Sequence, residues 1–234
     1  MGPPEDPSKP APDAGGVRGY VRPVLPAATY YSPDGEPIAY GQRWGQDGPP
    51  PDSYSVLSHP ERFGGLHDVA RALISHLEET YDVEVDDSTS SSTDLLRQPD
   101  GVVHSVRVTP RKPGAATMTF ALMQPPGVIV HAGILHDFSF PPCGCDACDE
   151  TVESAADRLE MLVLAVAAGG YGERYPIGWR RWLGYSLTSA DGSATESGEG
   201  DPGSIAADRL RSAKARLRDM PGGWLPWPPR QRQK

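Results

Sequence analysis

Residues 102–135, VVHSVRVTPRKPGAATMTFALMQPPGVIVHAGIL, carry the clearest structural pattern in the chain. Large apolar side chains alternate with smaller or polar ones over 102–109 and over 118–122, which is the period of half-buried strands. Residues 128–135 are almost continuously apolar, as in a well-covered strand. The turn sequences at 111–114 and 124–127 contain proline and glycine, and such short links make neighbouring strands antiparallel. The stretch therefore predicts an antiparallel β-meander.

Helical patterns flank this meander. Apolar residues recur at helical spacing in three segments, 59–81, 149–168 and 204–219. Ser58 and Glu61 have capping-box spacing, which favours a start of the first helix near His59. The predicted fold class is α+β: an antiparallel β-meander of three to five strands packed with two or three helices, with long Pro/Gly-rich irregular arms.

Composition divides the chain into segments. Glycine and proline supply 52 of 234 residues, and 13 of the 26 prolines lie in the first 60 positions. This share, about 22%, exceeds the usual share of roughly 12%. We expect a disordered tail at 1–19 and a single α+β domain at 20–230. Its expected parts are an aromatic and Pro-rich arm at 20–57, a helix–meander–helix core at 58–187, a disordered loop at 188–203, and a C-terminal helix with a Trp-containing tail at 204–230. Within the core we expect a mobile surface loop at 86–100 and a further strand at 179–188.

Charge and hydropathy argue against several classes of partner. The net charge is −9, which disfavours nucleic acid and anionic lipid surfaces. The longest strongly apolar run, 161–168, is far shorter than the ~20 residues of a membrane-spanning helix, and residues 1–16 lack the apolar core of a signal peptide. We expect a cytoplasmic protein with no membrane partner, and a protein partner stays open.

The three cysteines lie within the run CGCDAC at 143–148. Such crowding cannot build a disulfide framework, which fits a reducing compartment. Thiolates at this spacing can converge on one tetrahedral ion, and a following helix start would lower the thiol pKa values. The alternatives are a chance cluster of free thiols and a CxxC redox pair, although the latter lacks its usual βαβ setting. We therefore expect a structural Zn²⁺ site formed by Cys143, Cys145 and Cys148.

A closed zinc site needs a fourth ligand. His136 and His131 are five residues apart in an extended segment, so their side chains point to opposite faces. We favour His136, which lies at the end of the strand, over His131 or an aspartate such as Asp137 or Asp146. A zinc deaminase is excluded, because Gly133 occupies the position of the proton-shuttling glutamate in its motif.

Three functions are compatible with these residues. The first is a zinc-stabilised binding or accessory domain without catalytic activity, since the common nucleophile, phosphate-loop and zinc-protease motifs are missing from the sequence. The second is a zinc-dependent hydrolase that uses a metal-bound water near His136, Asp137 and Glu150. The third is a polyanion-binding module formed by the C-terminal basic helix, with Arg209, Arg211, Lys214, Arg216 and Arg218.

The motif CGCDACDE at 143–150 resembles an uncharacterised actinobacterial family that is a domain of unknown function. The similar blocks are YGQRW at 40–44, SHPERF at 58–63, HAG at 131–133 with LHD at 135–137, and WLPW at 224–227. The resemblance covers about residues 20 to 230. It implies that the whole chain is one family unit and brings no activity.

Overall fold

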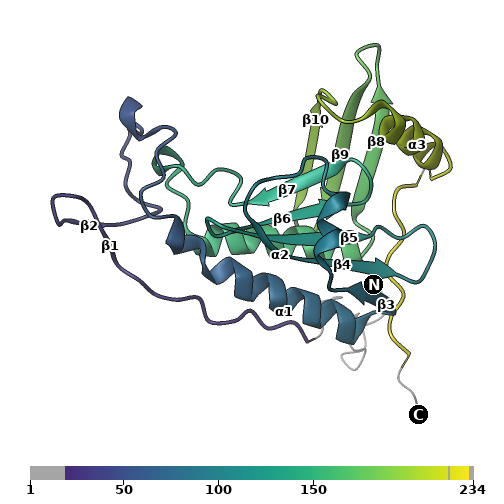
Figure 1. Ribbon diagram of the computed structural model, residues 1–234, viewed down its shortest axis with the longest axis horizontal. Helices are drawn as coiled ribbons and strands as arrows, with labels where there is room; N and C mark the ends of the chain where they lie inside the picture. The colour runs from purple at the N-terminus through teal and green to yellow at the C-terminus, as the bar shows by residue number, and fades with distance from the viewer. Residues whose placement is uncertain (1–18, 221, 232–234) are drawn as a thin grey trace, which may run out of the picture.

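The computed structural model describes residues 19–220 and 222–231, so the expected tail at 1–19 lies, except for Gly19, outside the described residues. The described part is mixed α+β, with antiparallel sheets and three α-helices, which confirms the predicted fold class (Figure 1). The α-helices are α1 (Gly65–Thr80), α2 (Val152–Ala167) and α3 (Ala207–Arg218).

A five-stranded meander forms the main sheet, with its strands in sequence order. The three strands expected from the 102–135 stretch are present, and one more lies at each edge of the sheet. The bounds are β3 (Val83–Asp86), β4 (Val102–Pro110), β5 (Met118–Met123), β6 (Gly127–Ala132) and β7 (His136–Phe140).

The two faces of the meander differ in chemistry. Even-numbered side chains of β4–β6 from Val106 onward, such as Val106, Phe120 and Val130, are buried in the main core together with α1 and α2. The opposite face carries a row of paired polar residues that crosses four strands: Arg107, Thr119, His131 and Asp137.

The segment 86–100 covers this polar face, although composition suggested a mobile surface loop. It contains the 3₁₀ helix η3 (Thr89–Asp94), and Leu95 just after it is only 3% exposed. The Asp94 carboxylate accepts hydrogen bonds from Arg107 and from Thr119 Oγ1 at 2.6 Å. These partners lie on distant strands, so the local sequence pattern could not reveal the packing.

A second sheet has the strand order β10-β9-β8 and rises steeply from the meander in Figure 1. Its strands are β8 (Tyr171–Ile177), β9 (Trp182–Thr188) and β10 (Thr195–Gly200). β9 corresponds to the strand expected at 179–188. The segment 188–203 differs from the expected disordered loop, because β10 pairs along β9 through backbone hydrogen bonds that need no large apolar side chains.

The N-terminal arm is held by small elements. A two-stranded hairpin joins β1 (Tyr30–Tyr31) to β2 (Pro37–Ile38), and the arm continues through η1 (Pro51–Ser53). After η2 (Pro60–Phe63), α1 begins at Gly65 rather than near His59. The expected capping box does not form, because the Ser58 hydroxyl donates to Asp146 instead.

The C-terminal tail docks through its tryptophans, as its sequence suggested. Trp224 and Trp227 are each 3% exposed. Trp227 Nε1 donates to the Ala116 carbonyl at 2.9 Å, and its backbone N–H donates to the Ala167 carbonyl. Within the described residues, no helix has both the length and the apolar character needed to cross a bilayer.

Candidate metal centre

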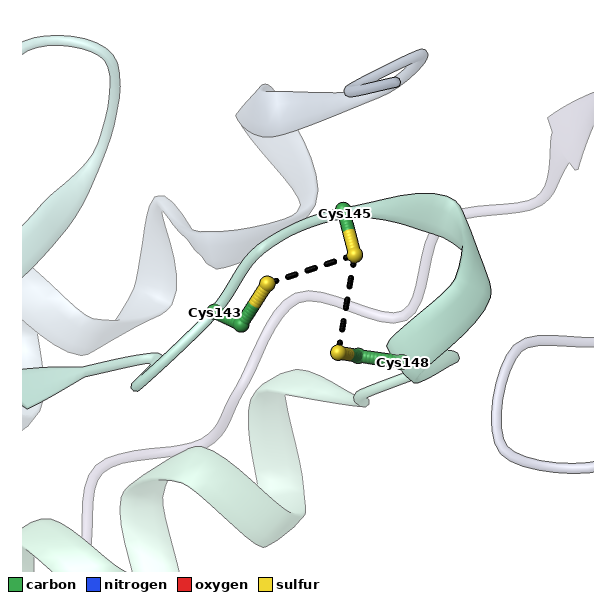
Figure 2. A group of neighbouring side chains, drawn as sticks. All are labelled: Cys143, Cys145 and Cys148. Carbon is green, nitrogen blue, oxygen red and sulfur yellow. Dashed lines mark hydrogen bonds between the residues drawn. The ribbon is translucent and has the colours of Figure 1, made fainter. Parts of the chain in front are cut away.

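The loop between β7 and α2 brings the three cysteine sulfurs together (Figure 2). The Sγ atoms of Cys143 and Cys145 are 3.2 Å apart, and those of Cys145 and Cys148 are 3.5 Å apart. All three lie within 4.8 Å of one another, and none is in a disulfide. Such a group could hold a metal ion.

A short 3₁₀ helix, η4 (Asp146–Cys148), produces this convergence. The Cys148 N–H donates to the Cys145 carbonyl at 3.1 Å, so the side chains three residues apart lie over one another. Asp149 ends the turn in a left-handed conformation, with φ of 50°. The turn thus gathers two sulfurs, and Cys143 reaches them from the extended segment before it.

Local hydrogen bonds separate the acidities of these thiols. Hydrogen bonds from the Cys143 thiol and from the backbone N–H groups of Cys148 and Ser55 lower the pKa of Cys145 to about 7. Hydrogen bonds with Cys143 and Cys145 raise the pKa of Cys148 to about 12. The helix α2 begins at Val152, with Thr151 as its cap, so its start lies further from the cysteines than the expected start at about Asp149.

The N-terminal arm forms hydrogen bonds with the cysteine loop at Asp146. The Asp146 N–H donates to the Val56 carbonyl at 2.8 Å, and the Asp146 carboxylate accepts from the Ser58 hydroxyl. The Asp146 carbonyl accepts from Trp44 Nε1 at 3.2 Å. The N–H and the carbonyl of this loop residue therefore bind the arm, and its carboxylate binds Ser58 just after the arm.

A buried arginine ties the same loop to the core. Arg62 is 5% exposed and donates to the carbonyls of Gly144 at 2.8 Å and Glu150 at 3.4 Å. Its guanidinium carbon lies 4.2 Å from the ring centre of Tyr40 and 4.3 Å from that of Phe63. Carbonyl oxygens and aromatic faces thus compensate the buried charge. Sequence patterns gave no sign of this role, because the partners come from distant segments.

The histidines considered as fourth ligands lie elsewhere. His136 is not in the sulfur group, and its Nδ1 lies 2.9 Å from Glu173 Oε1. The strand β7 separates it from the cysteines, and four residue steps at about 3.3 Å each extend the chain by roughly 13 Å. His131 Nδ1 lies 2.7 Å from Asp137 Oδ1 on the opposite face of the sheet.

The carboxylates considered for hydrolysis are also engaged apart from the sulfurs. Asp137 accepts from the Leu96 N–H at 2.8 Å, in addition to its contact with His131. Glu150, just before α2, forms an ion pair with Arg158 within α2. Within the described residues, the structure does not bring His136, Asp137 and Glu150 to one metal-binding group.

Sequence reasoning missed Glu173, whose side chain has no exposed surface. Its signal is faint: Glu173 shares the inward face of β8 with Tyr171 and Tyr175, so an acid occupies a core position in an alternating strand. An inward carboxylate of this kind needs several donors, and the sequence does not show where they come from.

Comparison with known proteins gives the family and no activity. No curated protein and no solved structure matches the chain. A model described as a family of unknown function matches residues 26–231, close to the range expected from the resemblance. The chain therefore belongs to this family of unknown function, DUF6226.

Proposed function

We propose that this protein is a binding or accessory domain without catalytic activity, in which Zn²⁺ on Cys143, Cys145 and Cys148 fastens the N-terminal arm to the core. The convergence of three sulfurs within 4.8 Å is the observation that carries the proposal. Tetrahedral zinc with Zn–S bonds of 2.3 Å places its sulfurs about 3.8 Å apart. The observed spacings of 3.2 and 3.5 Å reach this value with small outward movements.

The fourth coordination position is proposed to face outward. Cys143 and Cys148 are exposed, so solvent or a side chain of a protein partner has access to an ion held there. His136 lies at the end of β7 that is far from the cysteine loop, outside the group of sulfurs, and this position does not favour it as the fourth ligand. A water or a partner ligand is therefore preferred to the histidine.

The surroundings of the loop support a structural role. Within the cysteine loop, Asp146 forms hydrogen bonds with Val56 of the arm and with Ser58, and the Gly144 carbonyl accepts a hydrogen bond from Arg62. An ion that fixes the cysteine loop therefore also fixes these contacts. Unpaired thiols suit a reducing compartment, and we include a cytoplasmic location in the proposal. The actinobacterial origin and the CGCDACDE motif as a mark of the family belong to the proposal as well.

Metal analysis tests the site. Protein purified without chelators is expected to carry about one equivalent of zinc, and Cys145→Ser is expected to lose most of it. Ser197→Ala on the exposed strand β10 is the control and should keep the metal. Less than about a tenth of an equivalent in the native chain, or equal metal in Cys145→Ser, would overturn the zinc assignment.

Limited proteolysis tests the structural role. Removal of the metal is expected to raise the cleavage rate within the arm at 20–57 by about tenfold or more, because the loop that anchors it loosens. Cleavage in the exposed turn at 189–194 serves as the internal control and should not change. An arm that stays equally protected after complete metal loss would contradict the fastening role.

The two alternative functions receive less support from the geometry. The hydrolase requires His136, Asp137 and Glu150 near the ion, and each has other partners. The polyanion module requires free bases on α3, whereas three of them make contacts within the chain. Arg209 donates to the Asp94 carbonyl, Arg216 lies over Trp224, and Arg218 donates to Asp219.

A further inference from the structure

The turn between β8 and β9 presents an exposed tryptophan at the free end of the second sheet. The two strands pair as far as Ile177 and Trp182, and the Arg181 N–H donates to the Gly178 carbonyl at 3.3 Å to close the turn. Trp179 within it is 86% exposed. Figure 1 shows this turn at the end of the sheet that points away from the meander. The indole buries little surface within the chain, so its apolar faces are free for a partner.

Arg180, next to this indole, is a cation without a carboxylate partner. Its guanidinium carbon lies 5.0 Å from the ring centre of Trp179 and 5.6 Å from that of Trp182. Among residues 19–220 and 222–231, its N–H groups have no hydrogen-bond acceptor. By contrast, Arg174 on β8 is paired with Glu199 at 3.0 Å. The two indoles therefore hold the guanidinium through cation–π contacts, while its donors stay free for a ligand.

The neighbouring arginine, Arg181, fixes the turn. Its φ is 56°, a left-handed conformation that favours glycine. The Arg181 guanidinium lies 5.6 Å from the ring centre of Tyr175 and donates to the Tyr175 hydroxyl at 3.3 Å. Tyr175 is buried in one apolar cluster with Ala213 of α3. The turn that presents Trp179 and Arg180 is thus anchored before a partner arrives, which reduces the ordering cost of binding.

The charge of the chain favours a carboxylate on a protein over a polyanion. A guanidinium can donate two parallel hydrogen bonds to one carboxylate, and this contact acts at short range. The whole chain carries a net charge of −9, which repels nucleic acid and anionic bilayers at longer range. Nucleic-acid binding commonly uses about 6–10 phosphate contacts, whereas Arg180 is a single free base at this turn. Tryptophan and arginine are also the residues that most often dominate the binding energy at protein interfaces.

We propose that the β8–β9 turn docks a protein partner through a segment in which a carboxylate lies beside an aromatic side chain. Arg180 binds the carboxylate with two hydrogen bonds, and Trp179 packs against the aromatic ring. This surface rests on the binding role proposed above and specifies its partner, but it does not use the metal.

Fluorine NMR of protein labelled with 5-fluorotryptophan tests the proposal, with the peptide acetyl-Glu-Phe-Glu-amide as the probe. Trp179→Phe identifies the Trp179 resonance, and the buried Trp224 is the internal control. The peptide is expected to shift the Trp179 resonance saturably, with a dissociation constant of about 1 mM for so small a ligand, and to leave Trp224 unshifted. Acetyl-Gln-Phe-Gln-amide, which lacks the carboxylates, and acetyl-Glu-Ala-Glu-amide, which lacks the ring, are expected to bind at least about fivefold more weakly.

Arg180→Lys provides the matched variant, because it keeps the positive charge and loses the planar pair of donors. It is expected to weaken peptide binding by at least about fivefold, whereas Arg71→Lys, at an exposed position on α1, leaves binding unchanged. The proposal is overturned if the native chain shows no Trp179 shift up to about 20 mM peptide. It is also overturned if Arg180→Lys or the glutamine peptide binds as tightly as the original pair. A thymidine oligonucleotide or phosphatidylserine vesicles that shift Trp179 at lower concentration than the peptide overturn the assignment to a protein partner.

The zinc content of the same samples separates this proposal from the metal site. Peptide binding by a native chain that carries no zinc would contradict the metal site alone. An unshifted Trp179 in a chain that carries zinc would contradict the docking surface alone.

Discussion

Gly133 lies in the turn between β6 and β7, at the point where that turn meets Glu173. Its φ is +72°, and a Cβ added there would lie 2.2 Å from Glu173 Oε2. Gly192 has the same φ of +72° and has nothing within 4 Å of an added Cβ. Comparing Gly133→Ala with Gly192→Ala therefore separates the cost of the backbone conformation, which both share, from the cost of a steric clash, which only Gly133→Ala has.

Both Gly→Ala changes are expected to lower the free energy of unfolding by about 1 kcal/mol, because alanine disfavours the left-handed backbone conformation. We expect Gly133→Ala to lower the free energy of unfolding by at least about 2 kcal/mol more than Gly192→Ala, because only the first displaces a buried carboxylate. Urea unfolding of both variants measures the difference. Equal losses would mean that Glu173 is not held against this turn.

Glu173 itself gives a second prediction at this scale. Glu173→Gln keeps an acceptor oxygen but turns an N–H₂ group toward groups that are themselves donors, such as the backbone N–H groups of Ile134 and Leu135. We expect a loss of about 2–4 kcal/mol in the free energy of unfolding. Glu199→Gln, whose carboxylate pairs with Arg174 on the surface, is the control and should change stability by less than about 1 kcal/mol. A small effect at both positions would contradict the buried network.

At the scale of elements, η3 is attached to the meander through Asp94. Burial raises the pKa of this carboxyl, but hydrogen bonds from Arg107 and Thr119 outweigh it and lower the pKa below its usual 3.8. A carboxyl with a lower pKa in the folded state than in the unfolded state stabilises the fold above the unfolded value. This stability is lost as the pH falls through the folded pKa.

The lowered pKa of Asp94 gives a pH test for the attachment of η3 to the meander. Asp94→Asn is expected to be less stable than the native chain at pH 6, by about 2 kcal/mol for the loss of charge-assisted hydrogen bonds. The difference should shrink as the pH falls below about 4, because the carboxyl of the unfolded chain is protonated first and the native carboxyl only at lower pH. Urea midpoints at several pH values measure it. A difference that stays constant down to pH 2 would exclude this linkage.

The helices and strands also differ in how well the sequence predicted them. The strands β4 and β5 follow from alternation, since a half-buried strand repeats every two residues, and β6 follows from its almost continuous apolar run. The start of α1 was misplaced, because Ser58 could cap a helix locally but binds Asp146, 88 positions away. β10 escaped notice, because an exposed strand of small and acidic residues depends on its neighbour β9 for its hydrogen bonds.

For the molecule as a whole, the C-terminal tail links parts that are distant in sequence. Trp227 contacts Ala116 before β5, Ala167 at the end of α2, and the Tyr81 ring after α1. Figure 1 shows the described part of the tail passing along this side of the meander. The tail therefore closes one end of the main core.

Removal of this contact is expected to weaken the entire fold. Trp227→Ala should lower the free energy of unfolding by about 3–5 kcal/mol, as for other buried aromatic truncations. Leu225→Ala, at a tail residue that is 44% exposed, is the control and should cost less than about 1 kcal/mol. Chemical denaturation measures both. A Trp227→Ala variant as stable as the Leu225→Ala control would show that the tail is not part of the cooperative core.

The sequence by itself determined the β-meander, the face of each long helix and the grouping of three thiols, because these depend on side-chain period or on residues a few positions apart. Only the tertiary structure decided that His136 turns to Glu173 instead of the cysteines, and that Arg62 and Asp146 bind the cysteine loop to the rest of the chain. These choices depend on which donors and acceptors are buried together. Hydrogen-bond partners that are separated by tens of residues leave no periodic signal in the sequence. The cost of burying an unpaired polar group decides which donors and acceptors pair, and this cost arises only when the chain is folded.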